Sequence, residues 1–125
     1  MTVYLSNAFS LSMLKEDSFL RVEEISLDKL KDYLNQIKFN VSCVIGHSST
    51  AQLVKQLLNH EFNCERKTVE LEPCDIVYTV QLGFRPEEGK IYSIEELEEL
   101  YQQNKIRFFR VRLFTPQVIT CLSYL

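Results

Sequence analysis

The chain contains little glycine or proline, no tryptophan and no excess of positive charge. Among its 125 residues there are three glycines and three prolines, and we find no internal repeat, linker or low-complexity segment. No stretch approaches the roughly twenty apolar residues that span a bilayer, so we expect a soluble protein with no membrane partner. The net charge of -3 argues against a general polyanion binder such as a protein that coats duplex nucleic acid. Any bound polyanion must therefore be held by local positive charge.

Signals for metal sites and for disulfide frameworks are also missing. There are only two histidines, and neither a Cys-x-x-Cys nor a His-Glu-x-x-His spacing occurs, so we expect no metal and no cofactor. The N-terminus has no basic region followed by a long apolar stretch. Together with the wide spacing of the cysteines, this favours a reduced, cytoplasmic protein. The four cysteines are Cys43, Cys64, Cys74 and Cys121.

What the sequence does have is enough apolar residues for one core. Hydrophobic residues make up 46% of the chain, which predicts a single domain over residues 1–125. Apolar residues that alternate, or that recur every three to four positions, predict an α/β fold with a mixed sheet of about five to six strands flanked by helices. Strands are expected at residues 3–5, 19–25, 39–45, 69–71, 76–82 and 106–113. Helices are expected at residues 27–37 after the cap Ser26, at 50–58 before Asn59, and after the capping box of Ser93 and Glu96.

The segments between these elements carry further expectations. A short helical turn is expected through Met13 and Leu14, and strands 69–71 and 76–82 are predicted to form a hairpin around Pro73. Residues 83–89 have a glycine at each end and form the most loop-like stretch of the chain. The apolar tail, residues 114–125, is predicted to pack on this subunit or on a partner.

A histidine stands at the corner between the expected strand 39–45 and the helix that follows it. The stretch reads Gly46-His47-Ser48-Ser49-Thr50. Because such corners often lie exposed at the end of a sheet, His47 is a candidate site residue, although it could simply cap the helix. The stretch lacks the second glycine of a Gly-x-Ser-x-Gly nucleophile elbow, which disfavours a serine hydrolase. Ser49 and Thr50 could hold a phosphate at the helix N-terminus, and helix capping explains them equally well.

Each group of charged residues elsewhere in the chain has two possible roles. Arg85, Glu88 and Lys90 lie on the glycine-bounded loop, where they could serve a site or a solvated surface. Arg110 and Arg112 share one face of the last strand, and they could contact nucleic acid or protect a strand edge.

Three motifs in order resemble the viral ring nucleases that act as type III anti-CRISPR proteins, which also occur in mobile elements and some cellular genomes. The motifs are Tyr4-Leu5-x-Asn7-Ala8-Phe9-Ser10-x-x-Met13-Leu14, Ile45-Gly46-His47-x-Ser49-Thr50 and Arg85-x-Glu87-Glu88-Gly89-Lys90. The resemblance runs from about Val3 to Phe109 and leaves the tail without a counterpart. This chain departs from the family at Ser48, where an acidic residue is frequent, and at Pro86, where leucine is frequent.

The resemblance implies a small α/β homodimer that binds cyclic tetra-adenylate between its subunits and cleaves it without metal to linear di-adenylates. Such a cyclic oligoadenylate phosphodiesterase switches off type III CRISPR signalling, in the host cytoplasm if the protein is viral. By resemblance, His47 is the general acid, Arg85 holds the reacting phosphate, and Glu88 orients a group or accepts a proton. The implied substrate-binding residues are Asn7, Ser10, Ser49, Thr50, Arg66, Gln81 and Lys90.

Two other classes of function remain as alternatives. A non-catalytic protein that sequesters or senses the cyclic oligonucleotide would use the same cleft, but it would have no need of a proton donor such as His47. A regulator that binds nucleic acid is disfavoured by the negative net charge and by the absence of an aromatic RNA-binding signature.

Overall fold

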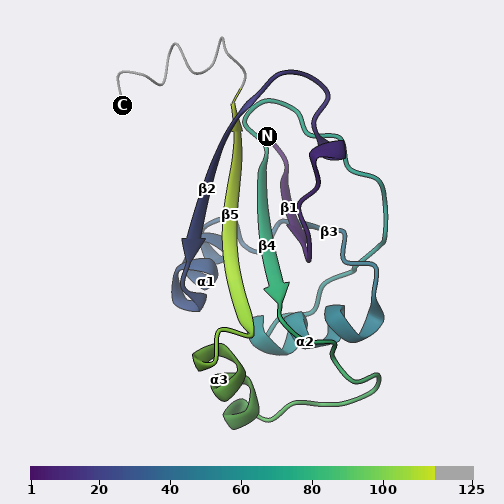
Figure 1. The fold of residues 1–125 in the computed structure, drawn as a ribbon, viewed down its shortest axis with the longest axis vertical. Coiled ribbons are helices and arrows are strands. Elements are labelled where there is room, and N and C mark those ends of the chain that lie inside the picture. Colours follow the sequence, from purple (N-terminus) through teal and green to yellow (C-terminus); the bar gives the residue numbers. More distant parts are fainter. Residues whose placement is uncertain (115–125) are drawn as a thin grey trace.

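The centre of the molecule is a sheet in which a parallel part joins an antiparallel part (Figure 1). The structure is a computed structural model that describes residues 1–114. The strands are β1 (Val3–Ser6), β2 (Phe19–Ile25), β3 (Ser42–Cys43), β4 (Ile76–Leu82) and β5 (Ile106–Phe114). In the order β2-β5-β4-β1-β3, β1 pairs in parallel with β3 and β4, and β5 pairs antiparallel with β2 and β4. The expectation of a single small α/β domain with a mixed sheet is confirmed.

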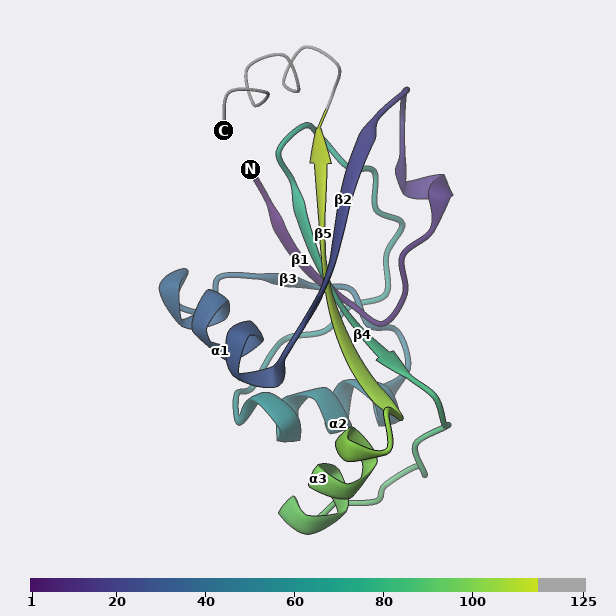
Figure 2. The same ribbon diagram turned by 60° about the vertical axis from the view of Figure 1, so that its left-hand side comes forward.

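The helices begin and end where local capping signals stand in the sequence. They are α1 (Leu27–Gln36), α2 (Ser48–Leu58), α3 (Ile94–Gln102) and the 3-10 turn η1 (Leu11–Met13). The hydroxyl of Ser26 accepts a hydrogen bond from the Lys29 N–H, and Ser93 and Glu96 form the expected capping box. Asn59 ends α2 in the left-handed conformation, at a φ of 49°. Figure 2 shows the three α-helices gathered on one side of the sheet, with η1 on the other side.

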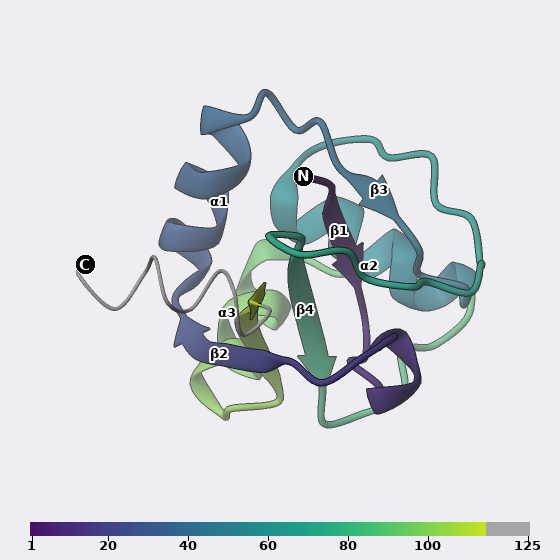
Figure 3. The same cartoon turned by 90° about the horizontal axis from the view of Figure 1, so that it is seen from above.

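The sheet buries apolar side chains on both faces. On the face toward the helices, Leu5, Val80 and Phe108 pack with the apolar stripes of α1 and α2. On the opposite face, Val77 and Val111 form a second cluster with residues from η1 and from the coil that precedes β4. In the view from above, η1 lies on the opposite side of the molecule from α1 (Figure 3). Both faces of β4 are therefore covered, which explains why this strand reads as an almost continuous apolar run.

The predicted hairpin of residues 69–71 with 76–82 is wrong. Residues 69–71 are coil, and they cover the face of the sheet instead of adding a strand to it. Val69 and Leu71 are both buried there, so the alternation of apolar residues correctly indicated burial. The buried Asp75 carboxylate accepts hydrogen bonds from the N–H groups of Thr2 and Glu72, each at 2.8 Å, and this fixes the turn before β4.

The strand expected at residues 39–45 is much shorter than the sequence pattern suggested. Lys38 and Phe39 have φ values of 55° and 54°, which are incompatible with an extended strand. The ladder of β3 is confined to Ser42 and Cys43. The Val44 N–H still bonds to the Leu5 carbonyl at 2.9 Å, so the chain follows β1 almost to the corner.

The expectation of reduced cysteines is contradicted for one pair. Cys43 on β3 and Cys64 are joined by a disulfide, and their Cα atoms lie 4.6 Å apart. Residue 64 forms a parallel bridge with Cys43, and the Glu65 N–H bonds to the Cys43 carbonyl at 3.0 Å. The sequence did not reveal this pair because the two cysteines are 21 positions apart. The fold brings them together where the coil around Cys64 runs alongside β3. Cys74 is free and exposed, while Cys121 and the packing expected of the tail lie outside the described residues.

The arginines of β5 are paired with carboxylates on β2. Arg110 and Arg112 donate to one oxygen of Glu23, at 2.9 and 3.0 Å. The hydrogen bond from Arg110, aided by the positive charges of Arg110, Arg21 and Arg112, holds the pKa of Glu23 below its ordinary value. Arg107 pairs with Glu24 at 2.9 Å. Protection of a strand edge is therefore the wrong explanation, because β5 lies inside the sheet between β2 and β4.

None of the helices within residues 1–114 has the length and apolar character of a membrane-crossing segment.

We predict that Cys64→Ser lowers the free energy of unfolding by about 3 kcal/mol under oxidising conditions, because it opens a cross-link between residues 21 positions apart. Cys74→Ser is the matched control, since Cys74 is exposed and free. Urea unfolding of both variants, with and without dithiothreitol, checks this prediction. A Cys64→Ser protein as stable as the wild type without reductant would show that the disulfide adds nothing.

Candidate functional site

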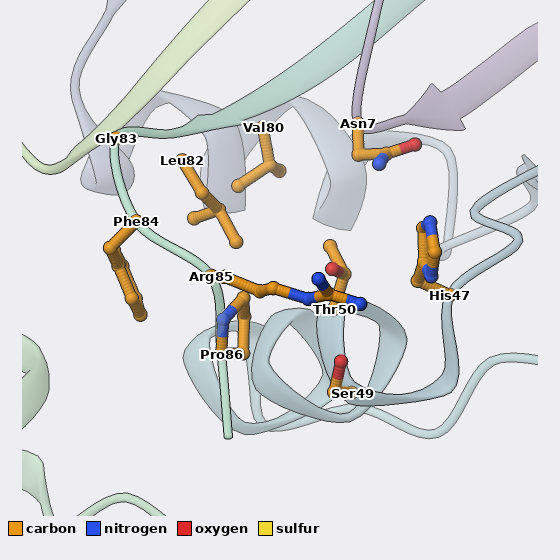
Figure 4. Close-up of a pocket in the computed structure, with 10 residues that line it drawn as sticks. All are labelled: Asn7, His47, Ser49, Thr50, Val80, Leu82, Gly83, Phe84, Arg85 and Pro86. Atoms are coloured by element: carbon orange, nitrogen blue, oxygen red, sulfur yellow. The ribbon is translucent and has the colours of Figure 1, made fainter. Parts of the chain in front are cut away.

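A cleft of about 510 Å³ opens where β1 and β4 end and α2 begins (Figure 4). Five of the residues expected to form a site line it, from three different parts of the chain. These are Asn7, His47, Ser49, Thr50 and Arg85. Because parallel strands end at the same edge of a sheet, the turns after β1 and β4 meet here.

The end of β1 is fixed by buried hydroxyl groups. The Ser6 hydroxyl lies 3.2 Å from that of Thr79 on β4, and it donates to the Ala8 carbonyl at 2.9 Å. Both Ser6 and Thr79 are buried. These bonds hold the turn after β1 against β4, and so they place the half-buried Asn7 at the rim of the cleft.

His47 is the N-cap residue of α2, but its side chain does not act as the cap. Its carbonyl accepts the first helical hydrogen bond, from the Ala51 N–H at 2.9 Å. Among the described residues its imidazole makes no capping hydrogen bond. The side chain is exposed and faces the cleft in Figure 4. The alternative that His47 serves only to cap the helix is therefore disfavoured.

Ser49 and Thr50 lie in the first turn of α2, next to the free N–H groups of that turn. Thr50 is buried and Ser49 is half-buried, and both line the cleft. The N-terminus of a helix carries partial positive charge, and its first N–H groups have no acceptor within the helix. An anion in the cleft would meet these groups and two hydroxyls together.

Arg85 enters the cleft from the loop after β4. The Gly83 N–H bonds to the Lys105 carbonyl at 2.8 Å, which anchors the beginning of the loop, and Pro86 is buried directly after Arg85. In Figure 4 the guanidinium extends over the start of α2, toward the side of the cleft that His47 forms. An imidazole and a planar guanidinium thus line one cleft.

Arg66 lies beside the cleft, packed against Gly46. A Cβ atom at position 46 would come within 2.8 Å of Cδ and 2.9 Å of Cγ of Arg66. A side chain at position 46 would therefore have to displace the exposed side chain of Arg66. This contact places a second cation next to the corner, although Arg66 does not line the cleft.

Besides Arg66, four predicted site residues lie away from the cleft lining. Ser10 is exposed, and its hydroxyl accepts from the Ser12 N–H at the start of η1. Gln81 and Glu88 are exposed at the end of β4 and in the loop. Lys90 pairs with Glu96 at 2.8 Å, and this hydrogen bond raises the pKa of Lys90 and lowers that of Glu96. Their roles in binding stay predictions.

The apolar wall of the cleft was missed by sequence reasoning. It consists of Val80, Leu82, Phe84 and Pro86, together with Gly83. Burial of Val80 follows from strand alternation, but the placement of Phe84 and Pro86 depends on the path of the loop. Within residues 1–114, no group of three or more histidine, cysteine or acidic side chains is arranged to hold a metal ion.

The model of the STIV B116-like family matches residues 3–108, which include every residue of the cleft. The chain belongs to this family. The solved structure of B116 from Sulfolobus turreted icosahedral virus superposes with a TM-score of 0.80 at 32% identity, covering 89% of this chain and 98% of that one. The identity and coverage support the same fold in both proteins.

Other relatives of this STIV B116-like chain come from viruses and a bacterium. The uncharacterized protein ORF116 of Acidianus filamentous virus 1 is 32% identical over 69 residues, which are 55% of this chain and 60% of ORF116, less than two thirds of that relative. The uncharacterized protein 26 of Sulfolobus islandicus filamentous virus is 27% identical over 100 residues, 78% of this chain and 83% of that protein. YddF of Bacillus subtilis is 38% identical over 50 residues, 40% of this chain and 46% of YddF.

We predict that Gly46→Ala lowers the free energy of unfolding by about 1 kcal/mol, the low end of the cost of overpacking, since the added methyl group overlaps the exposed side chain of Arg66. Gly83→Ala is the control, because its Cβ would meet nothing nearer than 3.6 Å. In an Arg66→Ala background the cost of Gly46→Ala should be clearly smaller. Denaturant unfolding of the four variants measures this coupling, and an equal cost in both backgrounds would contradict the contact.

Proposed function

We propose that this chain is a metal-independent ring nuclease that cleaves cyclic tetra-adenylate to linear di-adenylates and so switches off type III CRISPR signalling. The observation that carries the proposal is the presence of His47 and Arg85 in one cleft at the N-terminus of α2. Phosphodiester cleavage without metal requires a proton donor, a cation and a fixed phosphate position, and this cleft has a candidate for each. The phosphate lies against Ser49 and Thr50 in this account.

The reaction begins with attack of a ribose 2'-hydroxyl on its own 3'-phosphate, in line with the bond to the departing 5'-oxygen. The P–O2' bond forms as the P–O5' bond breaks, which gives a 2',3'-cyclic phosphate, and the proton of the 2'-hydroxyl passes to Glu88 or to solvent water. His47 protonates the leaving oxygen, a role that suits histidine because it exchanges protons near neutral pH. Arg85 stabilises the negative charge that grows on the phosphoryl oxygens, with its planar guanidinium reaching two of them.

Glu88 has a less direct part in this mechanism. It is exposed on the loop that carries Arg85, and it does not line the cleft. A carboxylate there orients Arg85 or the 2'-hydroxyl, or accepts its proton, once the ring is bound.

The size of the cleft supports a homodimer as the active form. A volume of about 510 Å³ suits a drug-sized ligand, whereas a ring of four nucleotides is larger. Two copies related by a twofold axis would match the symmetry of the ring and present His47 to two opposite phosphates. Arg66, Gln81, Ser10 and Lys90 would then contact parts of the ring outside the cleft of one subunit.

Because the proposed substrate is a second messenger inside the host cell, the proposed function implies a cytoplasmic protein.

The proposal is tested by incubating the protein with cyclic tetra-adenylate in EDTA, beside a ring whose four sugars are 2'-deoxyribose. We expect only the ribose ring to be cut, with a 2',3'-cyclic phosphate as the first product, because the deoxy ring lacks the attacking oxygen. Chromatography with mass spectrometry separates these products.

Cleavage of both rings would instead indicate a hydrolytic phosphodiesterase that activates water. Binding of both rings without cleavage would leave the sequestering or sensing protein as the function.

We predict that His47→Ala slows single-turnover cleavage of the ribose ring at least about a hundredfold, which is the usual scale of general acid catalysis. Affinity for the deoxy ring should change by no more than a few fold, because the proton is needed only as the bond breaks. His60→Ala is the matched control, since His60 lies outside the cleft and stacks on Phe39 with ring centroids 4.1 Å apart. A His47→Ala protein that cleaves at the wild-type rate would remove His47 from the reaction.

A further inference from the structure

Tyr92 fills the inside of the loop that carries Arg85. The residue is only 9% exposed, although the loop around it is largely open to solvent. The phenol oxygen accepts a hydrogen bond from the Glu87 N–H at 3.2 Å, and the ring packs edge-on against Phe84 with centroids 6.3 Å apart. Tyr92 therefore contacts the loop on both sides of Arg85.

The backbone of Tyr92 is tied in turn to α2. The side-chain amide of Gln56 donates to the Tyr92 carbonyl and accepts from the Tyr92 N–H, each at 3.3 Å. This paired contact resembles one step of a β-ladder, because a single residue has both its donor and its acceptor satisfied. Gln56 belongs to the same helix whose first turn holds Ser49 and Thr50, directly after His47.

These contacts form a continuous path from one side of the cleft to the other. α2 carries the anion-binding N–H groups at its start and Gln56 two turns later, and Gln56 holds Tyr92. Tyr92 holds the backbone two residues beyond Arg85. The Arg85 side chain extends from an exposed stretch of loop, so its position over the start of α2 depends on the position of that backbone.

We infer that Tyr92 is a positioning residue for Arg85, with Gln56 as its anchor on α2. The inference rests on the proposed function, since it assigns the hydroxyl of Tyr92 to placing the phosphate-stabilising guanidinium opposite His47. A displacement of about 1 Å in such a group can lower the rate up to about a hundredfold. Loss of one hydrogen bond that positions the loop should therefore lower the cleavage rate. The hydroxyl itself touches no part of the substrate in this scheme.

The test uses Tyr92→Phe, which keeps the buried ring and removes only the acceptor of the Glu87 N–H. Tyr101→Phe is the matched control, because Tyr101 lies on α3, where its ring packs against that of Phe108 with centroids 5.7 Å apart. Hydrogen exchange of the Glu87 amide in the full-length protein is measured first. We expect exchange to accelerate about fivefold or more in Tyr92→Phe, which is the scale of one lost hydrogen bond. In Tyr101→Phe it should stay at the wild-type rate.

Kinetics then show whether the hydroxyl acts through Arg85. Tyr92→Phe should lower the single-turnover cleavage rate about tenfold and leave the affinity for the 2'-deoxy ring within about twofold. Combined with Arg85→Ala, it should slow cleavage by less than about twofold beyond Arg85→Ala alone, since the group being positioned is gone. A merely structural role would lower binding and stability together and would add to the effect of Arg85→Ala.

The two arms separate failure of this inference from failure of the proposed function. Unchanged exchange at Glu87 overturns the positioning role whatever the enzyme does, and so does an additive effect on the Arg85→Ala background. If the wild type leaves the ring intact, the proposed function fails, and the catalytic assignment of Tyr92 is overturned with it. Accelerated exchange would then support only the contact between Tyr92 and the loop.

Discussion

The parallel pairing of β1 with both β3 and β4 is the constraint on which the rest of the site depends. Parallel strands end at one edge of a sheet, so the segments that follow them converge there. Asn7 follows β1, His47 follows the chain that leaves β3, and Arg85 follows β4. The hydrogen bond between the Ser6 and Thr79 hydroxyls, at 3.2 Å, holds the end of β1 against the middle of β4. Without this pairing, the three side chains would have no common cleft.

The remaining contacts around the cleft stabilise segments that have little regular structure. β3 contributes only two residues, and the disulfide from Cys43 to Cys64 fastens the neighbouring coil to it. That coil carries Arg66, whose side chain fills the space above Gly46. On the other side of the cleft, the loop with Arg85 is held through Tyr92. Two irregular segments are thus fixed next to a rigid sheet and helix, which is a common arrangement for binding residues.

Features that depend on neighbours in the sequence could be predicted, and features that depend on distant partners could not. The caps at Ser26, Asn59 and Ser93 are local, and their predictions are confirmed. The corner at His47 was also visible, because a strand-like run, a glycine and a helical stripe adjoin there. Coil 69–71 was mistaken for a strand, since burial against the face of a sheet produces the same alternation as pairing within it.

The same distinction applies to the candidate site. Asn7, His47, Ser49, Thr50 and Arg85 were named from local motifs and the resemblance, and the fold brings all five into one cleft. The disulfide, the contact of Arg66 with Gly46 and the link from Gln56 to Tyr92 join residues 20 or more positions apart in the sequence. No pattern within a single segment could indicate them. The ion pair of Lys90 with Glu96 likewise depends on how the loop meets α3.

For an acidic chain to act on a polyanion, positive charge and N–H groups must be brought together, and Arg85 and the start of α2 meet in this cleft. The location of the proposed ring-binding site is therefore the most direct test of the proposed function. NMR titration of the wild-type protein with the uncleavable 2'-deoxy ring should shift the imidazole resonances of His47, the amides of Ser49 and Thr50, and the side-chain amide of Asn7. Shifts confined to residues outside the cleft, or no shifts at all, would contradict it.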